Sequence, residues 1–110
     1  MTSKARIKGY ATVRKGRVIL ESKGYIVANL EKTGKFVKEK DLFGLWDCLA
    51  IRQKELLFIQ YKTNLSPGKK KISKWLNPFI EFGKLHGSEL VRFEVWISFD
   101  RVGFKVIECE

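Results

Sequence analysis

The sequence predicts a single α/β domain over residues 1–110, with helices packed on a mixed sheet of about five strands. The chain of 110 residues has the length of one domain, and its 45% hydrophobic and 13% aromatic content is sufficient for a core. The apolar pattern changes along the chain between helical spacing and alternation, in the order helix, three strands, helix, two strands. This order favours the α/β class.

The first element is predicted to be a basic helix over residues 3–22. Gly24 follows this range, where glycine commonly ends a helix. A strand over residues 25–31 and a turn around Gly34 come next. Apolar side chains recur at roughly helical spacing within the predicted helix, at Ile7, Tyr10, Ala11, Val18 and Ile19.

Residues 45–51 and 56–62 are predicted to form an antiparallel hairpin around the polar connection "RQKE". A connecting loop of two or four residues has its centre at the middle of "RQKE". With such a loop, Asp47 lies opposite Gln60, and Lys62 lies opposite Leu45. Opposed side chains share a face, as do Gln60 and Lys62 by alternation along the strand. Three polar groups are therefore expected to converge, whereas a loop of odd length would shift the register and separate them.

The second half of the chain is predicted to begin with a basic loop, "SPGKKK", and a helix over residues 72–85. Pro78 either kinks this helix or starts it, with Asn77 as the N-terminal cap. After a turn at "HGSE", strands are expected over residues 90–100 and 102–108, each buried on one face.

The charge of the chain indicates a polyanionic partner, with nucleic acid the obvious candidate. The net charge is +10, and residues 1–84 hold 19 basic groups against seven acidic ones. A basic protein that is merely soluble remains an alternative. The residues predicted to contact phosphate are Lys69, Lys70, Lys71, Lys74, Arg6, Lys8, Arg14, Lys15 and Arg17. The alternative is that these side chains form only a solvated surface.

The two cysteines, Cys48 and Cys109, lack metal-binding spacing and are expected to be buried free thiols of a reducing compartment. No apolar run reaches the length of a membrane span, and the N-terminal residues lack the apolar core of a secretory signal. These features predict an intracellular, cytoplasmic protein that does not enter the membrane.

The three polar groups of the predicted hairpin are those that metal-dependent phosphodiester cleavage requires. A hard divalent cation binds oxygen ligands such as those of Asp47 and Gln60. A lysine such as Lys62 orients the attacking water or stabilises charge on the phosphate. The alternative is a polar cluster of structural importance at a strand end. His86 is expected to be a turn residue and not a general base. The residues expected in the core or in an interface are Trp46, Trp75 and Trp96.

Beyond this chemistry, the chain resembles a known family over nearly its whole length. Asp47 followed by Gln60-Tyr61-Lys62 across a hairpin resembles the PD-(D/E)XK nuclease superfamily, and within it the archaeal Holliday-junction resolvases are most similar. The segments that carry the likeness are "KGY" at 8–10, "LESKGY" at 20–25, "FIEFGKLHG" at 79–87 and "GFKVIE" at 103–108. The segment "DLFGLWDCLAI" also resembles one in related candidate nucleases.

The resemblance implies a restriction-endonuclease-like core and a role for each residue of the motif. Asp47 matches the metal-binding aspartate, Gln60 the (D/E) position and Lys62 the catalytic lysine, while Tyr61 would lend its backbone carbonyl to the metal. The implied cofactor is Mg²⁺, with Mn²⁺ as a substitute. The implied function is a hydrolase of DNA recombination, an endonuclease that cuts branched or distorted duplex DNA as a homodimer.

Two departures from the family pattern leave a second function open. Gln60 keeps an oxygen but lacks the negative charge, and Val13 and Arg14 stand where the resolvases have a helix glutamate. Glu21 lies about 11 Å along the helix from that position, too far to replace the glutamate. Glu39 and Asp41 precede Asp47, and Asp41 would be about 20 Å from it unless the chain bends at Gly44. The alternatives are a non-catalytic DNA-binding module on the same fold and a basic structural protein of a ribonucleoprotein or virion. The candidate dimer contacts, which are equally candidates for the core, are Trp75, Phe79, Phe82 and Trp96.

Overall fold

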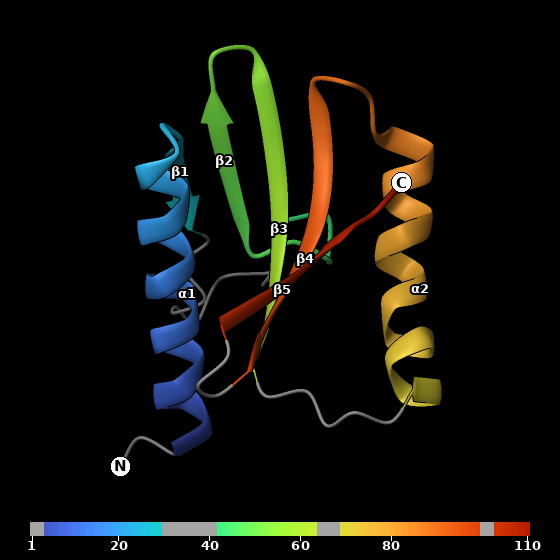
Figure 1. Ribbon diagram of the computed structural model, residues 1–110. Coiled ribbons are helices and arrows are strands. Elements are labelled where there is room, and N and C mark those ends of the chain that lie inside the picture. Colours follow the sequence, from blue (N-terminus) through green and yellow to red (C-terminus); the bar gives the residue numbers. More distant parts are fainter. Residues whose placement is uncertain (1–3, 30–41, 64–68, 100–102) are drawn as a thin grey trace, which may run out of the picture.

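The computed structural model describes residues 4–29, 42–63, 69–99 and 103–110, with side chains described for residues 11–29, 42–63, 73–99 and 103–110. The predicted α/β class is confirmed, with five strands in one mixed sheet and two helices (Figure 1). The elements in chain order are α1 (Lys4–Ser22), β1 (Ile26–Asn29), β2 (Cys48–Arg52), β3 (Glu55–Thr63), α2 (Lys69–His86), β4 (Val91–Phe99) and β5 (Gly103–Glu108).

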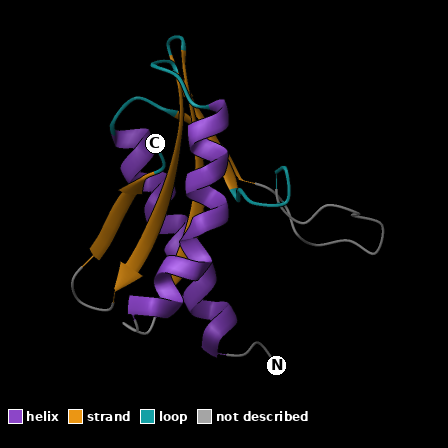
Figure 2. Cartoon of the chain, turned by 90° about the vertical axis from the view of Figure 1, so that its right-hand side faces the viewer, coloured by secondary structure: helices purple, strands orange, loops and turns teal. Residues whose placement is uncertain are grey.

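The strands lie in the order in which they occur in the sequence, β1-β2-β3-β4-β5. The pair β3–β4 is parallel and the other three pairs are antiparallel. A parallel pair needs a crossover connection, and α2 provides it. The helices lie on opposite sides of the sheet (Figure 1), and α2 runs along the side that faces the viewer in Figure 2. The core is therefore divided into two layers, one under each helix.

The helix α1 ends at the predicted glycine. The N–H of Gly24 donates to the carbonyl of Glu21 at 3.0 Å, and the N–H of Tyr25 donates to that of Leu20 at 3.1 Å. Gly24 has a φ of +90°, a left-handed conformation that glycine adopts without strain. The helix then packs on β3, where the hydroxyls of Thr12 and Thr63 are 2.7 Å apart.

Gly16 lets α1 approach β3 closely, because a β-carbon at this position would collide with the ring of Tyr61. Alanine at an interior helix position normally stabilises a helix by about 1 kcal/mol relative to glycine. We expect Gly16→Ala to do the opposite and to lower the free energy of unfolding by about 1–3 kcal/mol through overpacking. Urea denaturation measures the change. Lys15→Ala, at the adjacent exposed position, is the control, and equal stability of both variants would contradict the prediction.

The predicted hairpin register is confirmed along the paired residues. Cys48 pairs with Ile59 and Arg52 pairs with Glu55. A loop of two residues connects the strands, and its first residue, Gln53, has a φ of +55°. The prediction of a strand from residue 45 is wrong, because β2 begins at Cys48.

A tight turn replaces the expected start of β2. Within it, the N–H of Leu42 donates to the carbonyl of Trp46 at 2.7 Å, and the N–H of Trp46 returns a bond to Leu42 at 2.9 Å. Leu45 is therefore not the strand partner of Lys62. The remainder of the predicted first strand, at residues 30–31, and the turn around Gly34 lie outside the described residues.

The helix α2 begins earlier than predicted and contains Pro78 in its interior. Of the two alternatives for Pro78, the one in which it starts the helix is wrong. The prediction of a loop at Lys69–Lys71 is also wrong, because these residues form the first turn of α2. Proline at position 78 removes the hydrogen bond to the carbonyl four residues earlier, and its ring crowds that carbonyl. The burial of Leu76 and Phe79 against the sheet, on either side of Pro78, keeps the helix continuous.

The strand β4 is buried on both faces between Phe93 and Ile97, so the prediction of a strand with one exposed face is wrong for it. Phe93, Val95 and Ile97 pack under α2, while Trp96 belongs to the other layer. The burial of β4 on both faces follows from the two core layers, one on each side of the sheet. β5, at the edge of the sheet, is largely exposed.

Both cysteines are free and buried, as predicted. Burial raises the pKa of Cys48 to about 11, and burial raises that of Cys109 to about 11 as well. Neither thiol is therefore ionised near neutral pH. Within the part of the chain that the structure describes, no helix has the length and apolar character needed to cross a membrane.

Candidate functional site

Asp47 is bound to β3 through both its backbone and its side chain. Its N–H donates to the carbonyl of Ile59 at 2.9 Å, and its carboxylate oxygen Oδ2 accepts the N–H of Tyr61 at 3.1 Å. The residue is only 9% exposed. Ile59 and Tyr61 flank Gln60 on β3. These two hydrogen bonds of Asp47 therefore agree with its predicted position opposite Gln60.

Gln60 and Lys62 lie on the face of the sheet that α2 covers. Along the parallel pairing Gln60 is the partner of Val95 and Lys62 the partner of Ile97, and both partners belong to the layer under α2. The Nε2 of Gln60 donates to the carbonyl of Tyr61 at 3.2 Å. Its Oε1 is buried and has no hydrogen-bond partner among the described residues. A buried oxygen without a partner is explained by strain, by water or by a bound ion.

The ammonium of Lys62 lies over an aromatic ring from α2. Its Nζ is 5.5 Å from the ring centroid of Trp75, within the range of a cation–π interaction. Trp75 was expected only as a core or interface residue. Its contact with Lys62 was not predicted, because this contact depends on the placement of α2 over the face that carries Lys62. Trp46 and Trp96 are core residues at 0% and 3% exposure.

The first helix lies on the other face of the sheet from Gln60 and Lys62. Val13 and Leu20 pack in the layer that contains Tyr61, and Arg14 points to solvent. Glu21 is exposed and pairs with Arg17 at 3.0 Å, so it does not join the site. The two other carboxylates considered from the sequence, Glu39 and Asp41, lie outside the described residues.

The oxygens that could hold a cation are the carboxylate of Asp47, the Oε1 of Gln60 and the carbonyl of Tyr61. These are hard donors of the type that Mg²⁺ prefers, and the orphaned Oε1 fits such a role. The described residues include no group of three or more histidines, cysteines, aspartates or glutamates placed to hold a metal. The donors thus fit a cation in type, with one negative charge among them, which predicts weak binding.

Both helices begin at the end of the sheet where β3 finishes (Figure 1). Helix N-termini carry positive partial charge and attract phosphate. The first two turns of these helices contain Lys69–Lys71 and the backbone of Arg6 and Lys8, although the side chains of these residues lie outside the described set. The remaining basic candidates are exposed, namely Arg14, Lys15, Arg17 and Lys74.

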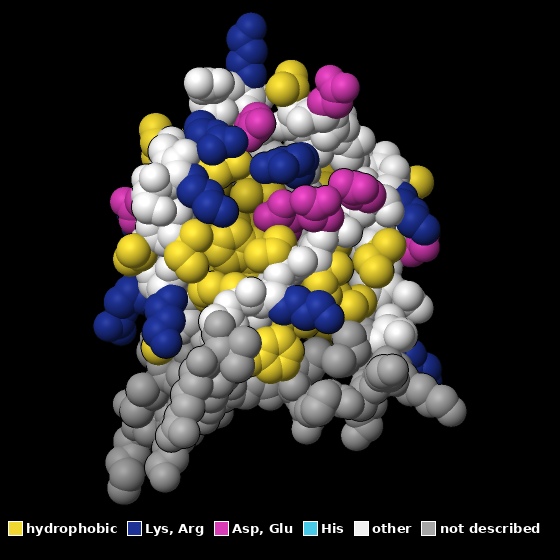
Figure 3. Space-filling model, viewed as in Figure 1, with side chains coloured by type: hydrophobic (Ala, Val, Ile, Leu, Met, Phe, Trp, Pro, Cys, Tyr) yellow, Lys and Arg dark blue, Asp and Glu magenta, His cyan; other side chains and the backbone are white. Residues whose placement is uncertain are grey.

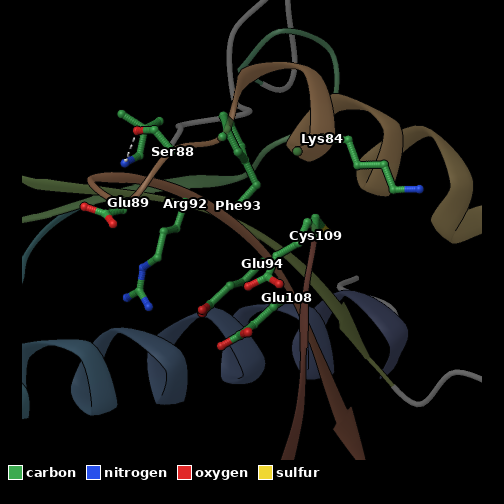
Figure 4. A pocket seen from close by; sticks show the side chains of 12 residues that line it. Lys84, Ser88, Glu89, Arg92, Phe93, Glu94, Glu108 and Cys109 are labelled. Atoms are coloured by element: carbon green, nitrogen blue, oxygen red, sulfur yellow. Dashed lines mark hydrogen bonds between the residues drawn. The ribbon is translucent and has the colours of Figure 1, made fainter.

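A hollow of about 430 Å³ lies elsewhere, between the last turn of α2, the start of β4 and the end of β5. Its acidic residues include Glu94 and Glu108, which pair across β4 and β5. Figure 4 shows these two side chains next to each other, with Lys84 pointing away. Figure 3 shows acidic side chains gathered on this face, with basic ones spread around them. A phosphate backbone would be repelled from this hollow.

His86 is exposed at the end of α2, and its ring lies 4.5 Å from that of Phe82. The prediction that His86 lies in a turn is wrong, because it is the last residue of α2. The chain matches no model of a known protein family and no curated protein sequence. The function therefore has to be inferred from the site itself.

Proposed function

We propose that the chain is a metal-dependent DNA endonuclease with a restriction-endonuclease-like core. The observation that carries the proposal is the arrangement of Asp47, Gln60 and Lys62 on the β2–β3 hairpin. The hydrogen bonds of Asp47 to Ile59 and Tyr61 fix it beside Gln60, and alternation puts Lys62 on the same face. The net charge of +10 and the helix N-termini at this end of the sheet support a DNA substrate.

In this proposal each residue has one task. Asp47, Gln60 and the carbonyl of Tyr61 hold Mg²⁺ or Mn²⁺, and a bound cation supplies Lewis-acid charge to the scissile phosphate. Lys62 stabilises the negative charge that develops on the phosphate. The ring of Trp75 restricts where the Lys62 ammonium lies.

A second candidate function is a non-catalytic DNA-binding module on the same fold. The single carboxylate among the candidate donors favours it, because catalytic cation sites commonly use more than one. The two functions are separated by incubating the protein with a labelled four-way junction and with linear duplex. Cleavage that needs Mg²⁺ or Mn²⁺ and stops with chelator supports the enzyme. Binding without cleavage under every condition supports the module.

The change Gln60→Glu tests whether the missing charge limits the enzyme. A glutamate restores a second anionic ligand, so we expect tighter cation binding and about tenfold faster cleavage at low Mg²⁺. Cleavage rates measured across a Mg²⁺ titration report the effect. Glu89→Gln, which removes an exposed carboxylate from the connection between α2 and β4, is the control. An unchanged Mg²⁺ dependence for Gln60→Glu would contradict the assignment of Gln60 as a cation ligand.

We also propose a homodimer, because one site cuts one strand at a time and a symmetric junction suits two related sites. Of the four apolar residues considered for its contact, Phe79 and Trp96 are buried in the core. Trp75 and Phe82 are partly buried and pack in the layer under α2. Light scattering at micromolar concentration is expected to give twice the chain mass for the free protein, and two chains per junction once the mass of the DNA is subtracted. A monomeric mass in both cases would exclude the dimer.

A further inference from the structure

Phe43 occupies an unfavourable backbone conformation at the tip of the turn over residues 42–46. Its φ is +56° and that of the following Gly44 is +73°. A bulky residue in the left-handed region costs about 1–2 kcal/mol, whereas glycine or asparagine is accepted there. The side chain is also 64% exposed, so it gains only part of the energy of burial. An outlier of this kind is a reason to look for a function.

The ring of Phe43 is held in place from one side. Its centroid is 5.7 Å from that of Phe82 in a stacked arrangement and 5.9 Å from that of Phe58. The turn is closed by the paired hydrogen bonds of Leu42 and Trp46, and Trp46 is fully buried. The ring is therefore a fixed aromatic surface with one part open to solvent.

This surface is close to the proposed cleavage site. Phe43 is separated from Asp47 by three residues, and Asp47 is bound to β3. Phe58, which the ring contacts, lies two residues before Gln60 on β3 and therefore on the same face. A DNA chain whose phosphate reached Gln60 and Lys62 would bring its neighbouring bases toward this ring.

We propose that Phe43 stacks on an unpaired or unstacked base and thereby directs the enzyme to distorted DNA. This inference rests on the proposed action on DNA. Stacking of a base on an aromatic side chain contributes about 1–3 kcal/mol, and every base has a face that can stack. In a matched duplex these faces are already covered. At a bulge or branch a base face becomes accessible with little loss of stacking energy, so the ring favours such DNA.

The test compares two DNA probes, a matched duplex and the same duplex with a single bulged 2-aminopurine, bound in the presence of chelator so that no cleavage occurs. Wild-type protein is expected to bind the bulged probe more tightly and to change its 2-aminopurine fluorescence. Phe43→Leu keeps apolar bulk but has no aromatic face. It is expected to lose about tenfold in affinity for the bulged probe and none for the duplex.

Two further variants separate stacking from folding. Phe43→Asn accepts the left-handed conformation and is expected to show the same selective loss as Phe43→Leu. Leu85→Ala removes another exposed apolar side chain, which is 77% exposed on α2, and is expected to leave both affinities unchanged. Melting temperatures identify any variant that fails to fold, and the remaining Phe43 variant then decides.

The outcomes distinguish this inference from the function on which it rests. Wild-type protein that binds neither probe overturns the action on DNA itself. Wild-type protein that binds DNA, with Phe43 variants that lose affinity equally for both probes or for neither, overturns only the stacking role. In that case Phe43 serves the packing of Phe58 and Phe82 alone.

Discussion

Replacing Asp47 with asparagine is expected to abolish metal-dependent cleavage while leaving DNA binding intact or stronger. Asp47 provides the negative charge among the three candidate donors, and asparagine keeps an oxygen that can accept the N–H of Tyr61. The loss is expected to reach about 10²–10³-fold or more in cleavage rate, the size found for removal of a key electrostatic contact. Binding is preserved because a negative charge that faces phosphate has been removed. Single-turnover cleavage and titration binding of a labelled junction measure the two quantities.

The controls for this prediction separate chemistry from folding. Lys62→Ala is expected to block cleavage as well, through loss of the charge that stabilises the phosphate. Glu108→Gln removes one negative charge from exposed β5 and is expected to leave the cleavage rate unchanged. If Asp47→Asn and Lys62→Ala instead lower the melting temperature without any effect specific to cleavage, these side chains serve the fold. In that case the DNA-binding module is the better description.

The hairpin register could be predicted because the sequence restricts it in two independent ways. A polar connection of even length fixes which residues face each other, and the alternation of Leu57, Ile59 and Tyr61 fixes which face is buried. A slip of one residue would move all three from the layer under α1 to the face that α2 covers. The class of fold followed for a similar reason, since the change from helical spacing to alternation is visible along the whole chain.

The errors occurred where tertiary packing outweighs local preference. Pro78 is a helix breaker by intrinsic propensity, yet it lies inside α2 because Leu76 and Phe79 pack on the sheet. β4 was expected to be exposed on one face, but a core layer covers each of its faces. Neither the neighbours of a strand nor the packing of a helix is encoded in the local pattern.

The candidate site was predictable only in its strand residues. Asp47, Gln60 and Lys62 are linked through the hairpin, which is local in sequence. The placement of Trp75 over Lys62 depends on how α2 crosses the sheet, and the strain at Phe43 depends on the turn geometry. Such contacts arise between elements, so residue types and spacing did not reveal them.

DNA binding is expected to weaken steeply with salt. Each phosphate that a lysine or arginine neutralises releases counterions, so the logarithm of affinity falls linearly with the logarithm of salt concentration. For about five such contacts, the affinity falls by roughly 500-fold between about 50 mM and about 200 mM salt. Fluorescence anisotropy of a labelled duplex and a labelled junction measures the slope.

The triple change of Lys69, Lys70 and Lys71 to alanine locates part of this binding energy at the start of α2. If these lysines contact phosphates, the slope becomes shallower and affinity falls alike for every sequence, because phosphates carry no sequence information. A triple change of exposed residues to alanine on the other helix, at Arg14, Lys15 and Arg17, is the matched comparison. The helix whose variant flattens the slope more faces the DNA, and α2 is the one expected, because it covers the face that carries Gln60 and Lys62. An affinity that stayed flat with salt would rule out a phosphate-based interface, and with it both DNA-directed functions.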